Sequence, residues 1–159
     1  MIREAVIADI PEIVRVGRRA LAKSLSHAVP VHKPTVFSVF QKFISNPDRL
    51  LIVAEHDGEI TGVLMMGLEA YWWDDARRGR RYATDWLFYS SRRDDGRKML
   101  RIGTEWAWTR PRVVDVTLGT NIPNHMDMTK KMYTQSGLQH VGHVFYLDNP
   151  HLLVGEEYV

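Results

Sequence analysis

The chain contains no cysteine. This absence excludes disulfide bonds, thiolate metal ligands and a cysteine nucleophile, and it is in keeping with a reducing compartment. No apolar stretch approaches the roughly 20 residues that a membrane-spanning helix needs. The residues Arg3, Glu4 and Asp9 interrupt the apolar positions that follow Met1. We therefore expect no signal peptide, no membrane association and a cytoplasmic location.

Motifs for metals and for nucleoside phosphates are also missing. The seven histidines are scattered, and His140 and His143 lie three apart on an expected strand, where their side chains point to opposite faces. No H-x-x-x-H pair and no carboxylate-rich loop is present, so we predict no metal site. The chain likewise lacks a Walker loop, a dinucleotide-binding turn and a Gly-x-Ser-x-Gly elbow.

What the chain does have is clustered positive charge. The formal net charge is only +2, yet the sequence pI is about 9.0. A solvated surface is one explanation of each cluster, and an anionic ligand is the other. The first cluster comprises Arg77, Arg78, Arg80 and Arg81, and the second comprises Arg92, Arg93, Arg97, Lys98 and Arg101. The second lies where a helix is expected to begin, and the start of a helix attracts anions.

The 159 residues, 45% of them hydrophobic, suit one globular domain over residues 1–159. Asp57-Gly58 between two apolar runs predicts a hairpin over residues 49–71. Asp9, with Glu12 three residues later, predicts a capping box that opens a helix. The expected order is a strand at 2–7, a helix at 10–25, a helix ending at Asn46-Pro47, the hairpin, a strand at 82–90, a helix at about 95–109, a strand at 112–119, a helix at about 124–135 and at least one more strand.

This order, with the segments YATDWLFYS, SRRDDG, RKMLRIGTEWAW, RVVDVTLGTN and NHMDMTKKMYTQSGL, resembles the core of the Gcn5-related N-acetyltransferase (GNAT) family. The resemblance covers nearly the whole chain. It implies an α/β fold (an α+β mixed sheet) with a splayed central sheet flanked by helices. It also implies that acetyl-CoA is the acyl donor and that an amine attacks it directly in a ternary complex.

The resemblance assigns the cofactor contacts to one strand and the turn after it. Main-chain groups of Trp86, Leu87, Phe88 and Tyr89 would bind pantetheine. The family usually carries Gln/Arg-x-x-Gly-x-Gly/Ala in the turn, whereas this chain has Ser91 and Asp94 at the first two motif positions and keeps only Gly96. The residues expected to hold the phosphates are Gly96, Arg92, Arg93, Arg97 and Lys98. Asp94 and Asp95 would repel a pyrophosphate, although both also suit a helix N-terminus.

Tyr133 and Asp85 are the expected catalytic residues. MYTQSGL resembles the Tyr-x-x-x-Gly end of the family's last helix, where the phenol lies near the CoA sulfur and often protonates the departing thiolate. The alternative is that Tyr133 packs in the core with its hydroxyl hydrogen-bonded. Asp85, with Glu69 as the alternative, is a candidate base, because burial among apolar neighbours would raise its pKa; the other alternative is that Asp85 faces solvent. Asn124 would contact the pantetheine arm or cap the helix that follows.

Two other functions stay open. The glycine-poor turn also fits a GNAT-fold protein that has lost catalysis and serves as a binding or structural component, and such turns occur in similar proteins encoded by tailed phages. A nucleic-acid-binding module would instead use the arginine clusters with Trp72-Trp73. Nucleic acid is the less favoured partner, and a homodimer is an open alternative to a monomer.

Overall fold

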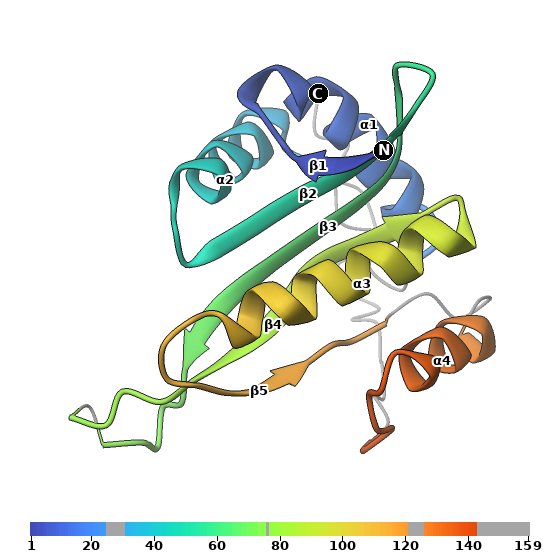
Figure 1. Ribbon diagram of the computed structural model, residues 1–159. Coiled ribbons are helices and arrows are strands. Elements are labelled where there is room, and N and C mark those ends of the chain that lie inside the picture. Colours follow the sequence, from blue (N-terminus) through green and yellow to red (C-terminus); the bar gives the residue numbers. More distant parts are fainter. Residues whose placement is uncertain (25–30, 76, 121–125, 143–159) are drawn as a thin grey trace, which may run out of the picture.

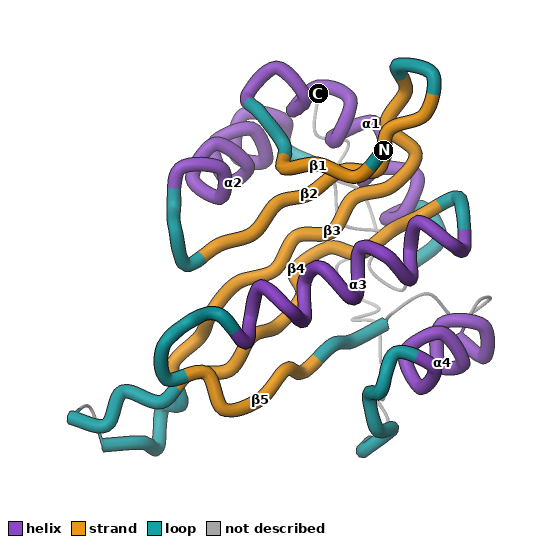
Figure 2. The backbone as a smooth tube through the Cα atoms, viewed as in Figure 1, coloured by secondary structure: helices purple, strands orange, loops and turns teal. Residues whose placement is uncertain are grey.

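The computed structural model describes residues 1–24, 31–75, 77–120 and 126–142. Within them, five strands form one sheet in the order β1-β2-β3-β4-β5. One helix, α3, covers one face of this sheet, and α1 and α2 cover the other (Figures 1 and 2). The elements are β1 (Ile2–Glu4), α1 (Ile10–Leu21), α2 (Lys33–Ser45), β2 (Arg49–His56), β3 (Glu59–Ala70), β4 (Arg81–Ser90), α3 (Arg93–Trp108), β5 (Val113–Thr117) and α4 (Met126–Gln135).

The sheet is mixed, as the order of segments predicted. Strands β1 to β4 are antiparallel neighbours, and β5 pairs with β4 in parallel after the crossover through α3. The predicted hairpin joins β2 to β3 at Asp57 and Gly58, whose φ angles are 51° and 81°. Glycine takes positive φ without steric cost and aspartate tolerates it, so this dipeptide fixes both the turn and the register of the central strands.

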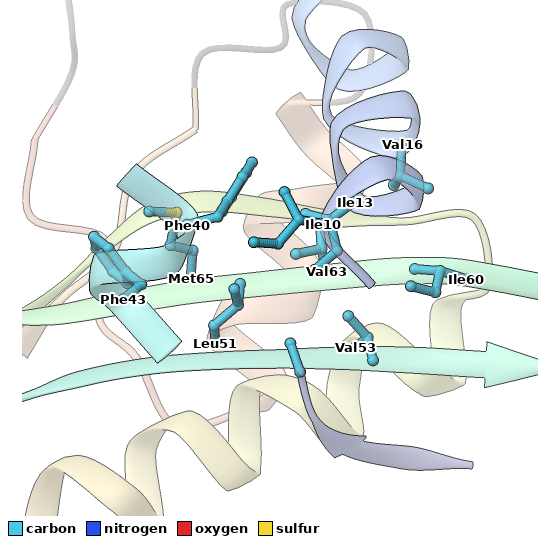
Figure 3. Packing of buried hydrophobic residues seen from close by; sticks show 11 residues of the cluster. Ile10, Ile13, Val16, Phe40, Phe43, Leu51, Val53, Ile60, Val63 and Met65 are labelled. Atoms are coloured by element: carbon cyan, nitrogen blue, oxygen red, sulfur yellow. The ribbon is translucent and has the colours of Figure 1, made fainter. Parts of the chain in front are cut away.

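Alternation along β2 and β3 divides the core into two layers. Leu51, Val53, Val63 and Met65 face α1 and α2, and Figure 3 shows this layer. The residues between them in the sequence face α3. The members of this second layer include Leu50, Ile52, Leu64, Met66, Met99 and Ala107. Because β2 and β3 are apolar on both faces, they form the buried centre of the domain.

The predicted capping box at Asp9 is wrong. Asp9 precedes α1, but its carboxylate accepts the N–H of Val6 at 2.8 Å and binds the guanidinium of Arg3 at 2.6 and 2.9 Å. Glu12 pairs with Arg15 instead. The short helical turn Ile7–Asp9 separates β1 from α1, so Asp9 closes this turn and ties it to β1. The carboxylate of Asp9 therefore binds Arg3 and the backbone that precedes it in the chain, rather than the first turn of α1.

Several predicted boundaries differ from the structure. Strand β1 is shorter than residues 2–7, and α3 begins at Arg93, two residues before the predicted start. Strand β5 spans Val113–Thr117 rather than residues 112–119. In α1 the buried positions are Ile10, Ile13, Val16 and Ala20, which recur at helical spacing. Of the expected strand that contains His140 and His143, residues 138–142 form no strand, and the rest lies in residues 143–159, outside the described part of the chain.

Gly103 marks the closest approach of α3 to the sheet. A Cβ at this position would lie 2.5 Å from Met66 Sδ and 2.8 Å from Leu64 Cδ2, both on fully buried side chains. Alanine at an open helix position stabilises by about 1 kcal/mol relative to glycine, whereas overpacking a core costs about 1–3 kcal/mol. We therefore expect Gly103→Ala to lower the free energy of unfolding in urea.

Glu105→Ala, on the exposed side of the same helix, is the control and should change stability by no more than about 0.5 kcal/mol. A net gain in stability for Gly103→Ala would mean that Met66 and Leu64 move aside without cost.

Candidate active site

Strands β4 and β5 part halfway along β4. Their parallel pairing runs from Arg81↔Val113 to Thr84↔Thr117 and ends there, while β4 continues to Ser90 along β3. The register of β3 with β4 skips Trp86, which marks a bulge at this point. A bulge bends its strand and increases the local twist, so it turns β4 away from its neighbour. From Asp85 onward, β4 therefore has an edge with backbone groups that β5 does not use.

The two predicted catalytic residues meet at this parting, on the peptide groups of Gly119. The backbone N–H of Gly119 donates to Asp85 Oδ1 at 2.9 Å, and the hydroxyl of Tyr133 donates to the carbonyl oxygen of Gly119 at 3.0 Å. The ring of Tyr133 also lies beside that of Phe88, with centroids 6.1 Å apart. Asp85 on β4 and Tyr133 on α4 thus both bind Gly119, which lies in the segment after β5.

Burial at this point shifts the pKa of both groups. Loss of hydration raises the pKa of Asp85 to about 6, and the hydrogen bond from Gly119 opposes this shift in part. Loss of hydration also raises the pKa of Tyr133, and the nearby negative charge of Asp85 raises it further. Near neutral pH, Asp85 is consequently a carboxylate that can take up a proton, and Tyr133 is a phenol that can give one.

The turn from β4 into α3 forms the second part of the site. Arg92 precedes the helix, its own side chain makes no capping hydrogen bond, and its N–H donates to Ser90 Oγ at 3.2 Å. The first turn of α3 carries the positive end of the helix dipole. Asp95 is buried and binds His56 Nε2 at 2.7 Å, with Arg92 Nε 3.6 Å away. Asp94 has a side chain that is 84% exposed. One of the two carboxylates is therefore occupied by other groups, and the other extends into water.

Helix α4 packs against the first turns of α3. Arg97 donates to Gln135 Oε1 at 2.8 Å, and Arg93 reaches the same oxygen at 3.5 Å. A Cβ on Gly96 would lie 3.2 Å from Met132 Sδ, so the glycine permits this close approach. Beside these contacts lies a cleft of about 760 Å³ between α3 and the end of α4. It is lined by Arg97, Lys98, Arg101, Thr104, Glu105, Trp108, Gln135 and Ser136.

The structure brings together some of the predicted residues and separates others. Leu87 and Tyr89 pack on the side of α1 and α2, whereas Phe88 lies on the side of α3. The side chain of Trp86 turns away from Asp85 and stacks at 5.1 Å on the guanidinium of Arg49. Glu69, the alternative base, is bound to the same arginine at 2.5 Å and is paired with Tyr82, on the face of the sheet opposite Asp85. Asn124 lies outside the described residues.

Sequence reasoning missed Gly119 and His56. Gly119 follows β5 and holds both candidate catalytic side chains through its backbone, which residue type alone does not reveal. A glycine at the end of an expected strand, beside a neighbouring strand that carries an aspartate, was the available signal. His56 lies 39 positions before its partner Asp95, so no local pattern connects them.

Within the described ranges, the structure has neither a candidate metal-binding group nor a candidate membrane-spanning helix. No group of three or more histidines, aspartates or glutamates is placed to hold a metal ion there. None of the described helices is both long and apolar enough to cross a membrane.

The sequence matches no protein-family model and no curated protein, but its structure is similar to several solved acetyltransferases. One is a predicted acetyltransferase with acetyl-CoA from Clostridium acetobutylicum (15% identity, TM-score 0.68, 93% of this chain and 95% of that chain). Another is glucosamine-6-phosphate N-acetyltransferase from Arabidopsis thaliana (17%, 0.63, 93% and 98%). A third is aminoglycoside 6'-N-acetyltransferase AAC(6')-IG from Acinetobacter haemolyticus (13%, 0.63, 94% and 97%).

The chain therefore has the fold of the Gcn5-related N-acetyltransferases, as its segments predicted. At these identities the likeness establishes the fold, whereas activity and acceptor depend on the residues of the site.

The raised pKa of Asp85 has a consequence for stability. A carboxyl whose pKa is higher in the folded than in the unfolded chain stabilises the fold below the unfolded value, here 3.8, and this contribution is lost as pH rises through about 6. Asparagine keeps the oxygen that accepts from Gly119 but does not titrate. We expect the stability of the native protein relative to Asp85→Asn to fall between about pH 4 and pH 6, as measured by urea unfolding.

Asp94→Asn, which alters an exposed carboxylate, is the control. A native-minus-Asp85→Asn difference that stays constant over this pH range would contradict burial of Asp85.

Proposed function

We propose that this protein is an N-acetyltransferase that moves the acetyl group of acetyl-CoA to an amine. The observation that carries the proposal is the meeting of Asp85 and Tyr133 at Gly119, where β4 and β5 part. A potential proton acceptor and a potential proton donor flank an opening in the sheet. This arrangement suits a reaction in which an amine loses a proton and a thiolate gains one.

Three features support acetyl-CoA as the donor. The free edge of β4 beyond Thr84 offers backbone groups to which pantetheine can bind as an added strand does. The N-terminus of α3 suits the pyrophosphate. Arg92, Arg93 and Arg97 lie at or within one turn of this N-terminus and would add charge-assisted hydrogen bonds to phosphate oxygens. A donor bound in this way extends from α3 to the parting beside Tyr133.

The reaction balances with these groups. The neutral amine nitrogen attacks the thioester carbonyl carbon, and a new C–N bond forms as the C–S bond breaks. Asp85 Oδ2, which does not accept the bond from Gly119, takes the proton that the amine gives up. Tyr133 donates its hydroxyl proton to the departing sulfur. The products are the acetylated amine and CoA, and subsequent proton exchange with water restores both side chains.

Direct transfer is the route that the composition favours. No cysteine is present to carry the acetyl group, so both substrates must be bound together. Holding the amine next to the thioester removes the entropic cost of their encounter, and this proximity supplies a large part of the rate acceleration.

Tyr133→Phe separates catalysis from binding. Loss of the phenol should lower kcat by about 10²- to 10⁴-fold, because a general acid acts as charge develops on sulfur, while the dissociation constant of acetyl-CoA stays nearly unchanged. The native pH–rate profile should rise through about pH 6 as Asp85 loses its proton. Steady-state kinetics with a panel of amines and calorimetric titration of acetyl-CoA give both quantities.

Ser45→Ala, which removes an exposed hydroxyl at the end of α2, far from the parting in the sequence, is the control for stability. An unchanged kcat in Tyr133→Phe would mean that Tyr133 contributes packing and does not act as the general acid. Tight acetyl-CoA binding without transfer to any amine would favour the alternative of a GNAT-fold binding protein.

The phosphate contacts give a second test. Replacing Arg92, Arg93 and Arg97 by alanine should weaken CoA much more than a pantetheine fragment without phosphates, because the lost hydrogen bonds are directed at phosphate oxygens. Binding of both ligands is measured by thermal shift, since a ligand that binds the folded state raises its apparent stability. Equal weakening of the two ligands would mean that the arginines act through the packing of α3 on α4.

Nucleic-acid binding has weaker support. Trp72 is 88% exposed, as a stacking residue would be, but two of the four arginines nearby are held by carboxylates. Arg80 binds Asp74 at 2.7 Å, and Arg81 binds Asp48 at 2.8 Å.

A further inference from the structure

The face of β4 and β5 opposite Asp85 bears a second group of polar and aromatic side chains. Tyr82 and Asp115 are paired across the two strands, two residues before the parting, so their side chains lie on the same face. The Tyr71 and Tyr82 rings are 5.0 Å apart, and the Tyr71 hydroxyl donates to Asp115 Oδ2. Strand register places Glu69 on this face too, opposite Tyr82. We call Tyr71, Tyr82 and Asp115 the β5 carboxylate group.

This face belongs to the side of the sheet that α1 and α2 cover elsewhere. Arg49, which is bound to Glu69, lies 5.2 Å from the ring of Phe43 on α2. The ring of Trp86 lies 5.1 Å from the same guanidinium and 5.3 Å from the ring of Phe43, and Trp86 is 55% exposed. The helices therefore cover the sheet incompletely here: Trp86 and Asp115 are exposed, and Tyr82 and Thr84 between them are half-buried.

The charge of Asp115 is not neutralised by the described residues. Its carboxylate is exposed and has only hydroxyl partners among them, from Tyr71 and, at 3.5 Å, from Thr117. Burial, together with Asp115, raises the pKa of Tyr71 to about 12, so the phenol remains protonated as a donor. Arg80, whose charge acts on Tyr71, is held by Asp74. Arg49 is likewise held by Glu69. A fixed negative charge beside two aromatic rings is thus left for a ligand.

We propose that the β5 carboxylate group binds a second ammonium group of the acceptor, so that the preferred substrate is a diamine rather than a monoamine. A carboxylate attracts an ammonium group by a charge-assisted hydrogen bond, and aromatic rings beside it add cation–π attraction. This inference rests on the proposed acetyl transfer, because it takes the parting beside Asp85 as the place where the reacting amine lies.

Strand geometry sets a lower limit to the length of the acceptor. Asp115 precedes Thr117, the last paired residue of β5, by two positions. Two residues of a strand span about 7 Å, and the passage through the parting to the face of Asp85 adds to this distance. An extended alkyl chain with bonds of roughly 1.5 Å needs at least about six bonds to separate two nitrogens by the distance along the strand. Cadaverine, a five-carbon chain with an amino group at each end, is the shortest diamine that meets this limit.

The arrangement separates the two substrates. Tyr133, Phe88 and the start of α3 lie on the face where the proposed donor binds, and the β5 carboxylate group lies on the other. The acceptor can then approach the thioester carbonyl through the parting without competing for the donor's space.

The test compares cadaverine, pentylamine and the ω-amino acid of the same chain length, each with acetyl-CoA. We expect kcat/KM of the native protein to be roughly five- to tenfold higher for cadaverine than for pentylamine, as one partly exposed ion pair with flanking rings provides. The amino acid, whose distal carboxylate would face Asp115, should be the poorest acceptor. Asp115→Asn keeps an acceptor for the Tyr71 hydroxyl and should abolish both differences. Glu59→Gln, which alters an exposed carboxylate at the other end of the sheet, should retain them.

Binding of the same three compounds in the presence of plain CoA, measured by calorimetry, gives a readout without turnover. Asp115-dependent preference for cadaverine in binding, with no acetyl transfer to any amine, would sustain this inference as a binding site and overturn the proposed function. Transfer to cadaverine and pentylamine with equal kcat/KM, or a preference that survives in Asp115→Asn, would overturn the inference and leave the proposed function intact.

Discussion

The parting of β4 from β5 is the constraint on which the rest of the site depends. Backbone hydrogen bonding holds the two strands together only as far as Thr84 and Thr117. Beyond this pair, the bulge at Trp86 turns β4 while β3 still supports it from the other side. One strand edge is thereby left available in the middle of the domain, where a fully paired sheet would have none. The segment after β5 diverges, and Gly119 then faces Asp85 across the opening rather than pairing with it.

The packing of helix α3 fixes its N-terminus next to this opening. Gly103 lets the middle of the helix approach Leu64 and Met66, and Gly96 lets its first turn approach α4. His56, at the end of β2, holds Asp95 in that first turn. The helix N-terminus is thereby fixed at the end of β4, directly beyond the opening. The same packing that buries the core also orients the positive end of the helix dipole toward the place where an anion can bind.

Asp85 and Asp115 show how position on a strand decides the chemistry of a carboxylate. Both lie close to the parting, but on opposite faces of the sheet. Asp85 is packed on the side of α3 and α4, so loss of hydration raises its pKa to about 6. Asp115 lies exposed beside Tyr71. The first is suited to exchange a proton, and the second to attract a cation.

Local sequence determined the elements and their order. The Asp57-Gly58 turn fixed the hairpin, Asn46-Pro47 ended α2, and Gly137, with a φ of 89°, follows the end of α4. Each of these features depends on the conformational preference of one or two residues, and that preference follows directly from the residue types in the sequence.

Only the tertiary structure determined which partner each charged group binds. The carboxylate of Asp9 binds Arg3 instead of capping a helix, and the carboxylate of Asp95 binds His56. It also decided that Asp85 is half-buried and that Tyr133 reaches Gly119. Such contacts join residues far apart in the chain, and their outcome depends on which groups lose water when the layers pack. The sequence by itself thus determined where strands and helices form, whereas only the packed fold determined the protonation and partners of the residues that would carry the chemistry.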